Sequence, residues 1–206
     1  MKYSHKAAVL ILALASAFPV MAQQSEGNWL VRGRATSLNF HNGQADGLPL
    51  AGTAKIEAGD RWIPEVDISY FFTRNIAAEL VLTYPQNIDI SIGGAKRGTI
   101  RALPPSLLLQ YHFTDFGAFK PYLGAGLNYT RFYKRNNILN GAASVDNSSF
   151  GLAGQLGFDY ALNKNWLINA DAKYVQMNTD VKLNGSKIGK VDLDPMIYSV
   201  GIGYRF

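Results

Sequence analysis

The sequence predicts an all-β fold, an eight-stranded antiparallel transmembrane β-barrel of the bacterial outer membrane. The last nine residues, YSVGIGYRF, place Tyr198, Val200, Ile202, Tyr204 and Phe206 at every second position, with small or polar residues between them. This alternation is typical of a strand with one apolar face. It continues to the final residue, and in a closed barrel the last strand pairs with the first while its outer face meets lipid. Taken alone, the segment also fits an edge strand of a soluble β-sandwich.

The amino-terminal end indicates export. Two lysines precede an apolar run at residues 7–18, and VMA at residues 20–22 supplies compact residues where signal cleavage requires them. We therefore expect residues 1–22 to be a cleaved signal peptide and residues 23–206 to form a single barrel domain. The apolar run is shorter than the about 20 residues that a spanning helix needs. Because no later apolar run reaches that length, the exported chain either is soluble or crosses a membrane as a barrel.

Alternating segments recur along the mature chain, separated by connections of two lengths. The predicted strands are residues 29–38, 62–72, 76–84, 104–113, 121–133, 150–160, 166–177 and 193–206. The long connections, which we expect to be extracellular loops, are residues 39–61, 85–103, 134–149 and 178–192. Long loops at one end and short turns at the other are the pattern of outer-membrane barrels, and four long loops with three short turns require eight strands.

Composition agrees with this fold and excludes other classes. The mean hydropathy of −0.03 is moderate, as expected for strands that alternate rather than run apolar throughout. The absence of cysteine excludes a disulfide-rich secreted domain and thiol chemistry. The formal charge of +5 includes two lysines of the expected signal peptide, and the other cations are scattered. We therefore expect no nucleic-acid partner.

Aromatic residues gather at the strand ends that adjoin the short turns. A girdle of aromatic side chains at the membrane surface is typical of outer-membrane barrels. The core of a soluble sandwich would not concentrate these residues at one end of every strand. The expected girdle consists of Trp29, Tyr70, Phe72, Tyr111, Phe113, Tyr122, Phe158, Tyr160, Trp166, Tyr204 and Phe206.

Several segments resemble the OmpW family, which also contains the AlkL-type alkane-uptake proteins. They are TRNIAAEL (73–80), LPPSLLLQYHF (103–113), FKPYLGAGLNYTRFY (119–133), GQLGFDYALNKNWLINADAKY (154–174) and VDLDPMIYSVGIGYRF (191–206). The resemblance covers essentially the whole mature chain and is weakest in the first loop and at residues 134–149. It implies an eight-stranded outer-membrane barrel associated with the passage of small hydrophobic molecules. It also implies a blocked barrel floor and escape of the cargo sideways into the bilayer.

If the apolar faces meet lipid, the opposite face of each strand lines the lumen. The interior of an eight-stranded barrel is just wide enough for its side chains, so buried charges should pair with one another rather than line a water channel. They form either a purely structural plug or the floor of a transport route, and both disfavour an open ion-selective pore. The predicted polar floor consists of Arg32, Arg34, Asp67, Glu79, Gln110, Gln155, Asp171 and Lys173.

Towards the extracellular end the predicted inner face becomes apolar. The inward side chains at that end, together with Pro49 and Ile56 of the first loop, either form an apolar funnel above the polar floor or only pack against the bases of the loops. Both interpretations remain open. The candidates for a hydrophobic passage are Leu48, Leu50, Ile63, Val81, Leu108, Val175 and Met177.

No catalytic constellation accompanies this pattern, so we expect a protein that is not an enzyme. The histidines are His5, His41 and His112, and His112 is better explained as a structural histidine than as a base. There is no HExxH motif, phosphate loop or metal-ligand cluster, so no metal or cofactor is expected. Asp192 and Asp194 resemble a carboxylate pair, but before a strand they are expected to cap a turn.

The predicted function is that of a channel-like barrel which admits small hydrophobic molecules, with a blocked periplasmic floor and lateral release into the bilayer. The alternative is a non-transporting surface barrel that acts in partner binding or membrane integrity. The expected partners are outer-membrane lipid, small hydrophobic solutes and the barrel-assembly machinery, which a carboxy-terminal strand ending in Phe206 would engage. We expect a monomer.

Overall fold

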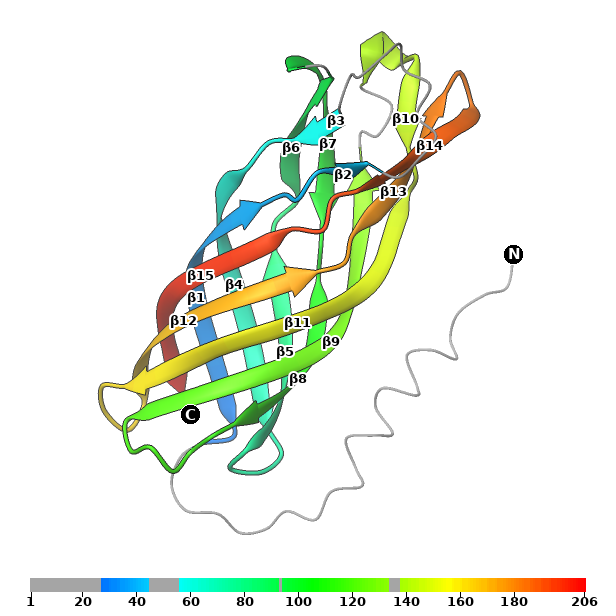
Figure 1. The fold of residues 1–206 in the computed structure, drawn as a ribbon. Coiled ribbons are helices and arrows are strands. Elements are labelled where there is room, and N and C mark those ends of the chain that lie inside the picture. The colour runs from blue at the N-terminus through cyan, green and yellow to red at the C-terminus, as the bar shows by residue number, and fades with distance from the viewer. Residues whose placement is uncertain (1–26, 45–55, 93, 134–137) are drawn as a thin grey trace.

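Eight long antiparallel strands close into a barrel in the computed structural model, which describes residues 27–44, 56–92, 94–133 and 138–206 (Figure 1). Each strand pairs with the next along the chain, and the last pairs with the first, from Leu30 opposite Arg205 to Asn39 opposite Met196. The predicted fold class is therefore confirmed. The expected signal peptide lies outside the described residues. The barrel strands are β1 (Trp29–Asn39), β4 (Arg61–Phe71), β5 (Ile76–Thr83), β8 (Ser106–His112), β9 (Phe119–Tyr133), β11 (Ser148–Ala161), β12 (Trp166–Val175) and β15 (Met196–Arg205).

Burial alternates along these strands and separates an outer apolar face from an inner face. In β8 the pattern is strict, with every second side chain buried. Leu109 and Ile202, predicted to face lipid, are 59% and 56% exposed. Leu80 and Leu127 are also exposed. A wall of exposed leucines, isoleucines and valines around a closed barrel is the surface that a hydrocarbon environment requires. Among the described residues, no helix is long and apolar enough to cross a membrane.

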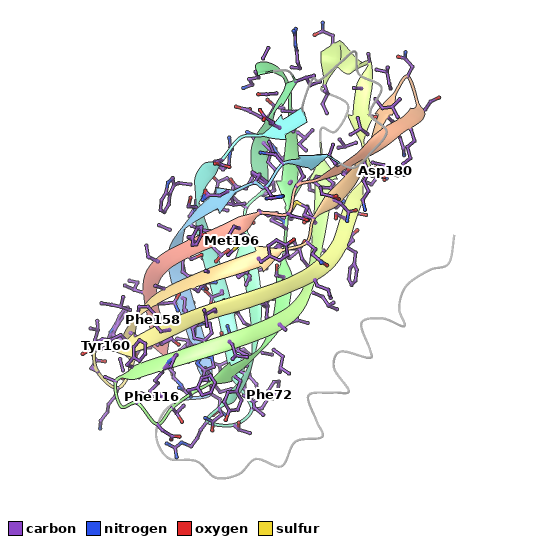
Figure 2. All side chains as sticks on the ribbon, in the orientation of Figure 1. Phe72, Phe116, Phe158, Tyr160, Asp180 and Met196 are labelled. Atoms are coloured by element: carbon purple, nitrogen blue, oxygen red, sulfur yellow. The ribbon has the colours of Figure 1, made fainter. Side chains whose placement is uncertain are left out.

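The short connections lie together at one end of the barrel, which we call the turn end (residues 72–75, 113–118 and 162–165). Asn163 forms the last of these turns by accepting hydrogen bonds from the backbone N–H groups of Asn165 and Trp166, both at 2.9 Å. Aromatic rings gather here, among them Phe72, Phe116 and Tyr160 (Figure 2). The predicted girdle is present, with one exception described below.

The opposite end, which we call the hairpin end, differs from the prediction. Residues 85–103 and 178–192 were expected to be loops, yet they form two further hairpins that extend the barrel wall. One consists of β6 (Gln86–Ile92) and β7 (Ala95–Leu103), and the other of β13 (Asn178–Leu183) and β14 (Ser186–Asp192). Short strands β2 (Gly43–Gln44), β3 (Ile56–Ala58) and β10 (Ala143–Val145), with a 3-10 turn at Leu139–Gly141, complete this end. The prediction of loops was wrong for these two segments because it relied on their polar composition and overlooked the alternation of apolar and polar residues within them.

The turn of the second hairpin follows ordinary strand chemistry. Asn184 and Gly185 join β13 to β14, with φ angles of 50° and 86°. Two consecutive residues with positive φ are what a tight two-residue hairpin turn demands, and Asn-Gly is the pair that adopts it most readily.

Candidate functional site: the barrel interior

Two arginines on β1 organise the charged part of the interior. Arg32 and Arg34 occupy alternate positions and therefore both point inward, where Asp67 and Glu65 on β4 lie directly opposite them. Arg32 Nη1 lies 2.9 Å from Asp67 Oδ1, and Arg34 Nη2 lies 2.8 Å from Glu65 Oε1. All four side chains are buried. The pairs offset the desolvation cost that each charge would carry alone.

The same arginines also reach across the lumen to strands far away in sequence. Arg32 donates to both carboxylate oxygens of Asp159 on β11, at 3.1 Å and 2.7 Å. Arg34 forms an ion pair with Asp171 on β12. Because each guanidinium has several donors in a fixed plane, one arginine can connect opposite walls of the barrel. Ion pairs across the lumen therefore connect opposite walls of the barrel, in addition to the hydrogen bonds between neighbouring strands.

All eight residues of the predicted polar floor meet in this region. Lys173 Nζ lies 3.5 Å from Glu65 Oε1, and Glu79 Oε1 lies 3.4 Å from Arg32 Nη1. Gln110 donates to Gln155, which donates to Asp171. The prediction missed two members, Glu65 and Asp159. We call the whole set the ion-pair layer, made of Arg32, Arg34, Glu65, Asp67, Glu79, Gln110, Gln155, Asp159, Asp171 and Lys173.

Tyr122 is the exception to the predicted aromatic girdle. Its side chain is fully buried inside the barrel rather than facing lipid. Its ring stacks on His112 at 4.8 Å between centroids, and its hydroxyl donates to Asp171 at 3.2 Å and accepts from Asn169 at 3.0 Å. The two β9 residues that flank it point outward or to the rim, so strand parity alone places Tyr122 within the lumen. His112 is buried in the same network, with its Nε2 3.0 Å from Gln110 Oε1.

A small apolar layer lies between the ion-pair layer and the turn end. Leu30, Phe71, Ala77 and Leu167 form this buried cluster. The guanidinium of Arg205 lies 3.9 Å from the centre of the Phe71 ring, a cation–π contact that covers the cluster. A cavity with an empty volume of about 450 Å³, partly open to solvent, lies at this end and is lined in part by Leu30, Phe71 and Arg205.

The other side of the ion-pair layer is apolar. Five of the predicted passage residues, Ile63, Val81, Leu108, Val175 and Met177, are buried here in one continuous cluster. The remaining two, Leu48 and Leu50, lie outside the described residues, as does Pro49. A cavity with an empty volume of about 330 Å³, partly open to solvent, lies among these side chains and reaches Glu65 and Lys173 of the ion-pair layer. We call it the inner cavity; it is lined by Thr36, Leu38, Ile63, Glu65, Val81, Thr83, Pro104, Ser106, Asn128, Lys173, Val175 and Ile197.

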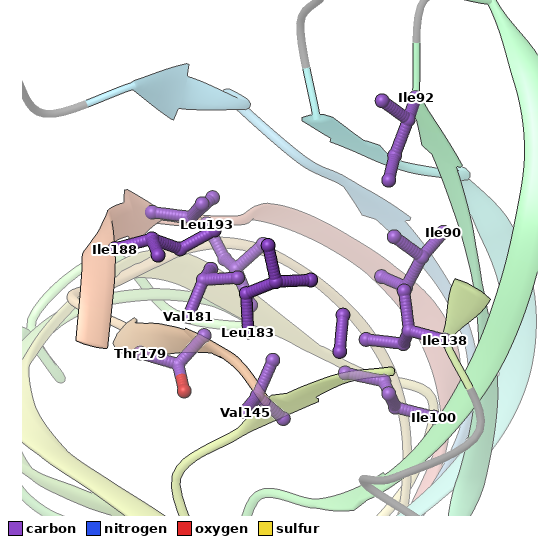
Figure 3. Close-up of a pocket in the computed structure, with 12 residues that line it drawn as sticks. Ile90, Ile92, Ile100, Ile138, Val145, Thr179, Val181, Leu183, Ile188 and Leu193 are labelled. Carbon is purple, nitrogen blue, oxygen red and sulfur yellow. The ribbon is translucent and has the colours of Figure 1, made fainter. Parts of the chain in front are cut away.

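A second and more apolar cavity opens between the hairpins (Figure 3). It has an empty volume of about 510 Å³, partly open to solvent, and Thr179 is its single polar lining residue among those described. Its inward side chains belong to the same buried cluster as the inner cavity. We call it the hairpin-end cavity; it is lined by Ile90, Ile92, Ile100, Ile138, Ala143, Val145, Thr179, Val181, Leu183, Ile188, Val191 and Leu193. None of these residues was among the predicted passage residues, because all except Leu193 lie in segments expected to be loops.

The barrel wall is interrupted beside the inner cavity. Pairing between β5 and β8 ends at Val81 opposite Ser106, and pairing between β6 and β7 begins at Gln86 opposite Ala102. In the described structure no strand pairing joins residues 82–85 to residues 103–105. We call this interruption the wall gap. Thr83 and Pro104, which lie on its two sides, both line the inner cavity.

Proline explains the wall gap. Pro85, Pro104 and Pro105 have no N–H group to donate across the strands. The carbonyl oxygen of Pro105 instead accepts from the backbone of Tyr129 on β9 at 3.1 Å, and Asn128 donates to the same oxygen at 3.0 Å. Asn128 also donates to the Pro104 carbonyl oxygen at 3.4 Å, so the carbonyl oxygens of both prolines are bonded to β9 rather than to β5.

The remaining predicted features are structural. Asp194 accepts a hydrogen bond from the backbone of Met177 at 2.8 Å, which fits the expected turn cap. Asp192 differs, because it lies at the rim 3.8 Å from Lys190. No group of three or more His, Asp or Glu side chains suited to a metal ion occurs within the described ranges.

Comparison with known proteins agrees with this architecture. The OmpW family model matches residues 25–206. The chain belongs to the OmpW family. It is 42% identical to an uncharacterised outer-membrane protein, y4mB, of Sinorhizobium fredii, over 91% of this chain and 86% of that protein. It is 32% identical to outer membrane protein W of Vibrio cholerae, over 95% and 96% of the two chains.

Among solved structures, OprG of Pseudomonas aeruginosa superposes with a TM-score of 0.77 at 31% identity, covering 89% of this chain and 97% of that chain. More distant relatives are outer membrane protein AlkL of Ectopseudomonas oleovorans, 29% identical over 74% of this chain and 70% of that protein, and a dibenzothiophene metabolism operon protein, PahQ, of Pseudomonas aeruginosa, 26% identical over 92% and 93%. This family member is an outer-membrane barrel.

Proposed function

We propose that this barrel admits small hydrophobic molecules from outside the cell and releases them sideways into the membrane through the wall gap. The observation that carries the proposal is the continuous apolar interior, which runs from the hairpin-end cavity to the inner cavity and stops at the ion-pair layer. The name of PahQ, a dibenzothiophene metabolism operon protein, supports an apolar and aromatic class of solute.

The orientation follows from the lengths of the connections. In outer-membrane barrels the short turns lie in the periplasm and the long connections outside the cell. We therefore assign the hairpin end to the cell exterior and the turn end to the periplasm. The carboxy-terminal strand then ends with Phe206 at the periplasmic rim, where the barrel-assembly machinery would meet it after removal of residues 1–22.

The ion-pair layer acts as the floor in this proposal. A hydrophobic solute that moved towards the periplasm would have to separate pairs such as Arg34–Glu65 and leave buried charges without partners, which costs several kcal/mol per broken pair (~3–5). Below the floor, Phe71 and its neighbours form a second buried cluster beside the cavity at the turn end. The axial route is therefore closed for apolar solutes and for ions alike.

The wall gap offers a route of lower cost. A solute in the inner cavity touches Thr83 and Pro104, which border the gap. To leave there it need not break a strand ladder, because no strand pairing joins residues 82–85 to residues 103–105 in the described structure. Leu82 faces outward beside the gap and is 39% exposed, so an emerging apolar solute would meet hydrocarbon directly.

Uptake measurements with polar substitutions test the proposal. Ile63→Asp and Val81→Asp each place a charge in the inner cavity, and each should slow the uptake of naphthalene by cells that depend on this protein. Ala95→Asp, an exposed change at the tip of the first hairpin, is the matched control and should leave uptake unchanged.

Folding of each variant is checked by the heat-dependent shift of the barrel on a denaturing gel. If Ile63→Asp and Val81→Asp fold and still support the full rate of uptake, hydrophobic transport is excluded, and a surface barrel that binds a partner takes its place.

A further inference from the structure

Two arginines face outward near the hairpin end, Arg101 on β7 and Arg131 on β9. Their neighbours Ala102 and Phe132 are buried in the interior, so strand alternation turns both arginines towards the membrane. Arg101 lies opposite Tyr133, and Arg131 lies opposite Leu103. The two arginines are thus diagonal neighbours on one face of a strand pair, with β-carbons about 7–8 Å apart. Both guanidinium groups can reach one small anion placed between them.

The depth of this pair follows from the apolar belt below it. The outward residues of β9 run from Phe119 to Tyr129 before Arg131 is reached. Ten residues at about 3.3 Å each, inclined by about 40°, span roughly 25 Å of height, which is the height of the apolar band of an outer-membrane barrel. Arg131 is therefore the first side chain above the hydrocarbon, at the depth of the lipid head groups.

Neither arginine has an ion-pair partner among the described residues. Arg131 lies over the ring of Tyr133, 5.4 Å from its centre, and Arg101 donates to the Asn87 amide at 3.0 Å. Both contacts orient the guanidinium groups without neutralising them.

The carboxylate on the adjoining β6 strand is already engaged. Lys96 lies 2.9 Å from Asp89 and lowers the pKa of that carboxyl, and Thr99 donates to it at 3.0 Å. Other cations of the hairpin end are also paired, such as Lys182 with Asp146 and Lys187 with Asp180. Arg101 and Arg131 differ from these paired cations in two ways. They lie on the lipid-facing wall, and their guanidinium groups have no carboxylate partner among the described residues.

We propose that Arg101 and Arg131 bind a phosphate group on the lipid A portion of lipopolysaccharide, the phosphorylated glycolipid of the outer leaflet. The guanidinium fork matches two phosphate oxygens at once, and two such forks can hold one phosphate group from both sides. The head-group depth selects a phosphate that is anchored by acyl chains, and the apolar belt of β9 below the pair would contact those chains. Ser148, opposite Arg131 on β11, adds a hydroxyl to the same face. The inference rests on the proposed orientation but not on hydrophobic transport.

A lipid-binding measurement tests this site. The mature barrel is folded in lipopolysaccharide-free nanodiscs and titrated with fluorescent lipid A that carries its phosphates, and separately with the same lipid after removal of the phosphates. Wild type should bind the phosphorylated lipid about thirtyfold more tightly, as expected for two interfacial arginines. Arg101→Gln with Arg131→Gln should abolish that preference. Arg97→Gln, an equal loss of charge at the exposed tip of the same hairpin, should preserve it.

Further variants keep the result interpretable. Arg101→Lys with Arg131→Lys retains both charges but lacks the fork, and it should recover only part of the preference. The proposal is overturned if the folded double glutamine variant discriminates the two lipids as wild type does, or if Arg97→Gln loses as much. It is also overturned if millimolar inorganic phosphate displaces lipid A completely, because the site would then recognise free phosphate. Unchanged naphthalene uptake in the double glutamine variant would separate this site from the transport route.

Discussion

Arg32 and Asp67 face each other across the β1–β4 ladder with 2.9 Å between the guanidinium Nη1 and the carboxylate Oδ1, and neither side chain is exposed. The next inward pair along the same ladder, Arg34 with Glu65, repeats the arrangement. Five carboxylates and three cations thus meet within a lumen that is barely wider than its side chains. This layer separates the large apolar cluster of the hairpin end from the small apolar cluster of the turn end, and the separation is the basis of the proposed function.

Removing one member of the layer should destabilise the barrel strongly. Arg32→Met leaves Asp67 and Asp159 buried without their main partner, and we expect a loss of about 3–5 kcal/mol in the free energy of unfolding. Urea unfolding in lipid vesicles, followed by tryptophan fluorescence, measures it. Arg74→Gln in an exposed turn is the control and should stay within about 0.5 kcal/mol of wild type. A variant at position 32 as stable as the control would show that the layer is not a structural barrier.

A charged side chain on the outer wall should lower the free energy of unfolding more strongly the nearer it lies to the middle of the membrane. Leu109→Arg, on the exposed face of β8, should lower the free energy of unfolding by about 2–4 kcal/mol at mid-membrane depth. Leu162→Arg, equally exposed but in a tight turn at the interface, should cost no more than about 1 kcal/mol. The comparison is made in the same vesicles. Equal tolerance of both changes would mean that Leu109 does not face hydrocarbon.

Two glycines on β11 provide a matched test of lumen packing. A β-carbon on Gly157 would lie 2.6 Å from the ring of Tyr122, whereas one on Gly154 would meet nothing within 4 Å. Gly157→Ala should therefore push Tyr122 aside and destabilise the barrel by about 1–3 kcal/mol. Gly154→Ala should be neutral or slightly stabilising, because alanine loses less backbone entropy on folding. Thermal unfolding of the two variants measures the difference. If Gly154→Ala proved less stable than Gly157→Ala, the result would contradict the buried position of Tyr122.

Topology can be measured directly because the chain has no cysteine of its own. Single cysteines in place of Lys96 or Lys187, both exposed at the hairpin end, should react with a membrane-impermeant maleimide on intact cells. Cysteines in place of Asn75 or Lys164 at the turn end should react only after the outer membrane is permeabilised. Labelling of the Lys164→Cys variant on intact cells would invert the proposed orientation.

The sequence predicted the strands closely because alternation depends on local burial alone. Residues 62–72, for example, were expected as a strand, and β4 runs from Arg61 to Phe71. The same rule could have found the hairpin-end cavity, since NIDISI at residues 87–92 alternates as clearly as any barrel strand. Its outward residues Asn87, Asp89 and Ser91 are polar, and they were therefore taken as loop composition.

Other features of the interior could not be predicted from the sequence. Asp159 is an inward residue near the turn end, and its bond to Arg32 spans 127 positions. Such a contact depends on how the strands are staggered when the barrel closes. Tyr122 was assigned to the girdle by its residue type, but its parity on β9 turns it inward. The wall gap likewise arises from three prolines that lie on two separate segments and meet only in the closed barrel.

Photolabelling with a hydrophobic probe distinguishes lateral release through the wall gap from passage through the floor. An alkyl diazirine is added outside cells that carry the barrel, activated by light, and its attachment sites are mapped by mass spectrometry. We expect labelling of inward residues at the hairpin-end cavity and inner cavity, such as Ile100, Val181 and Val81, and of Thr83 beside the wall gap. Labelling of outward Leu109 through the lipid is the internal standard. Labelling of Leu30, Phe71 or Leu167, below the ion-pair layer, would show that solutes pass through the floor and would contradict lateral release.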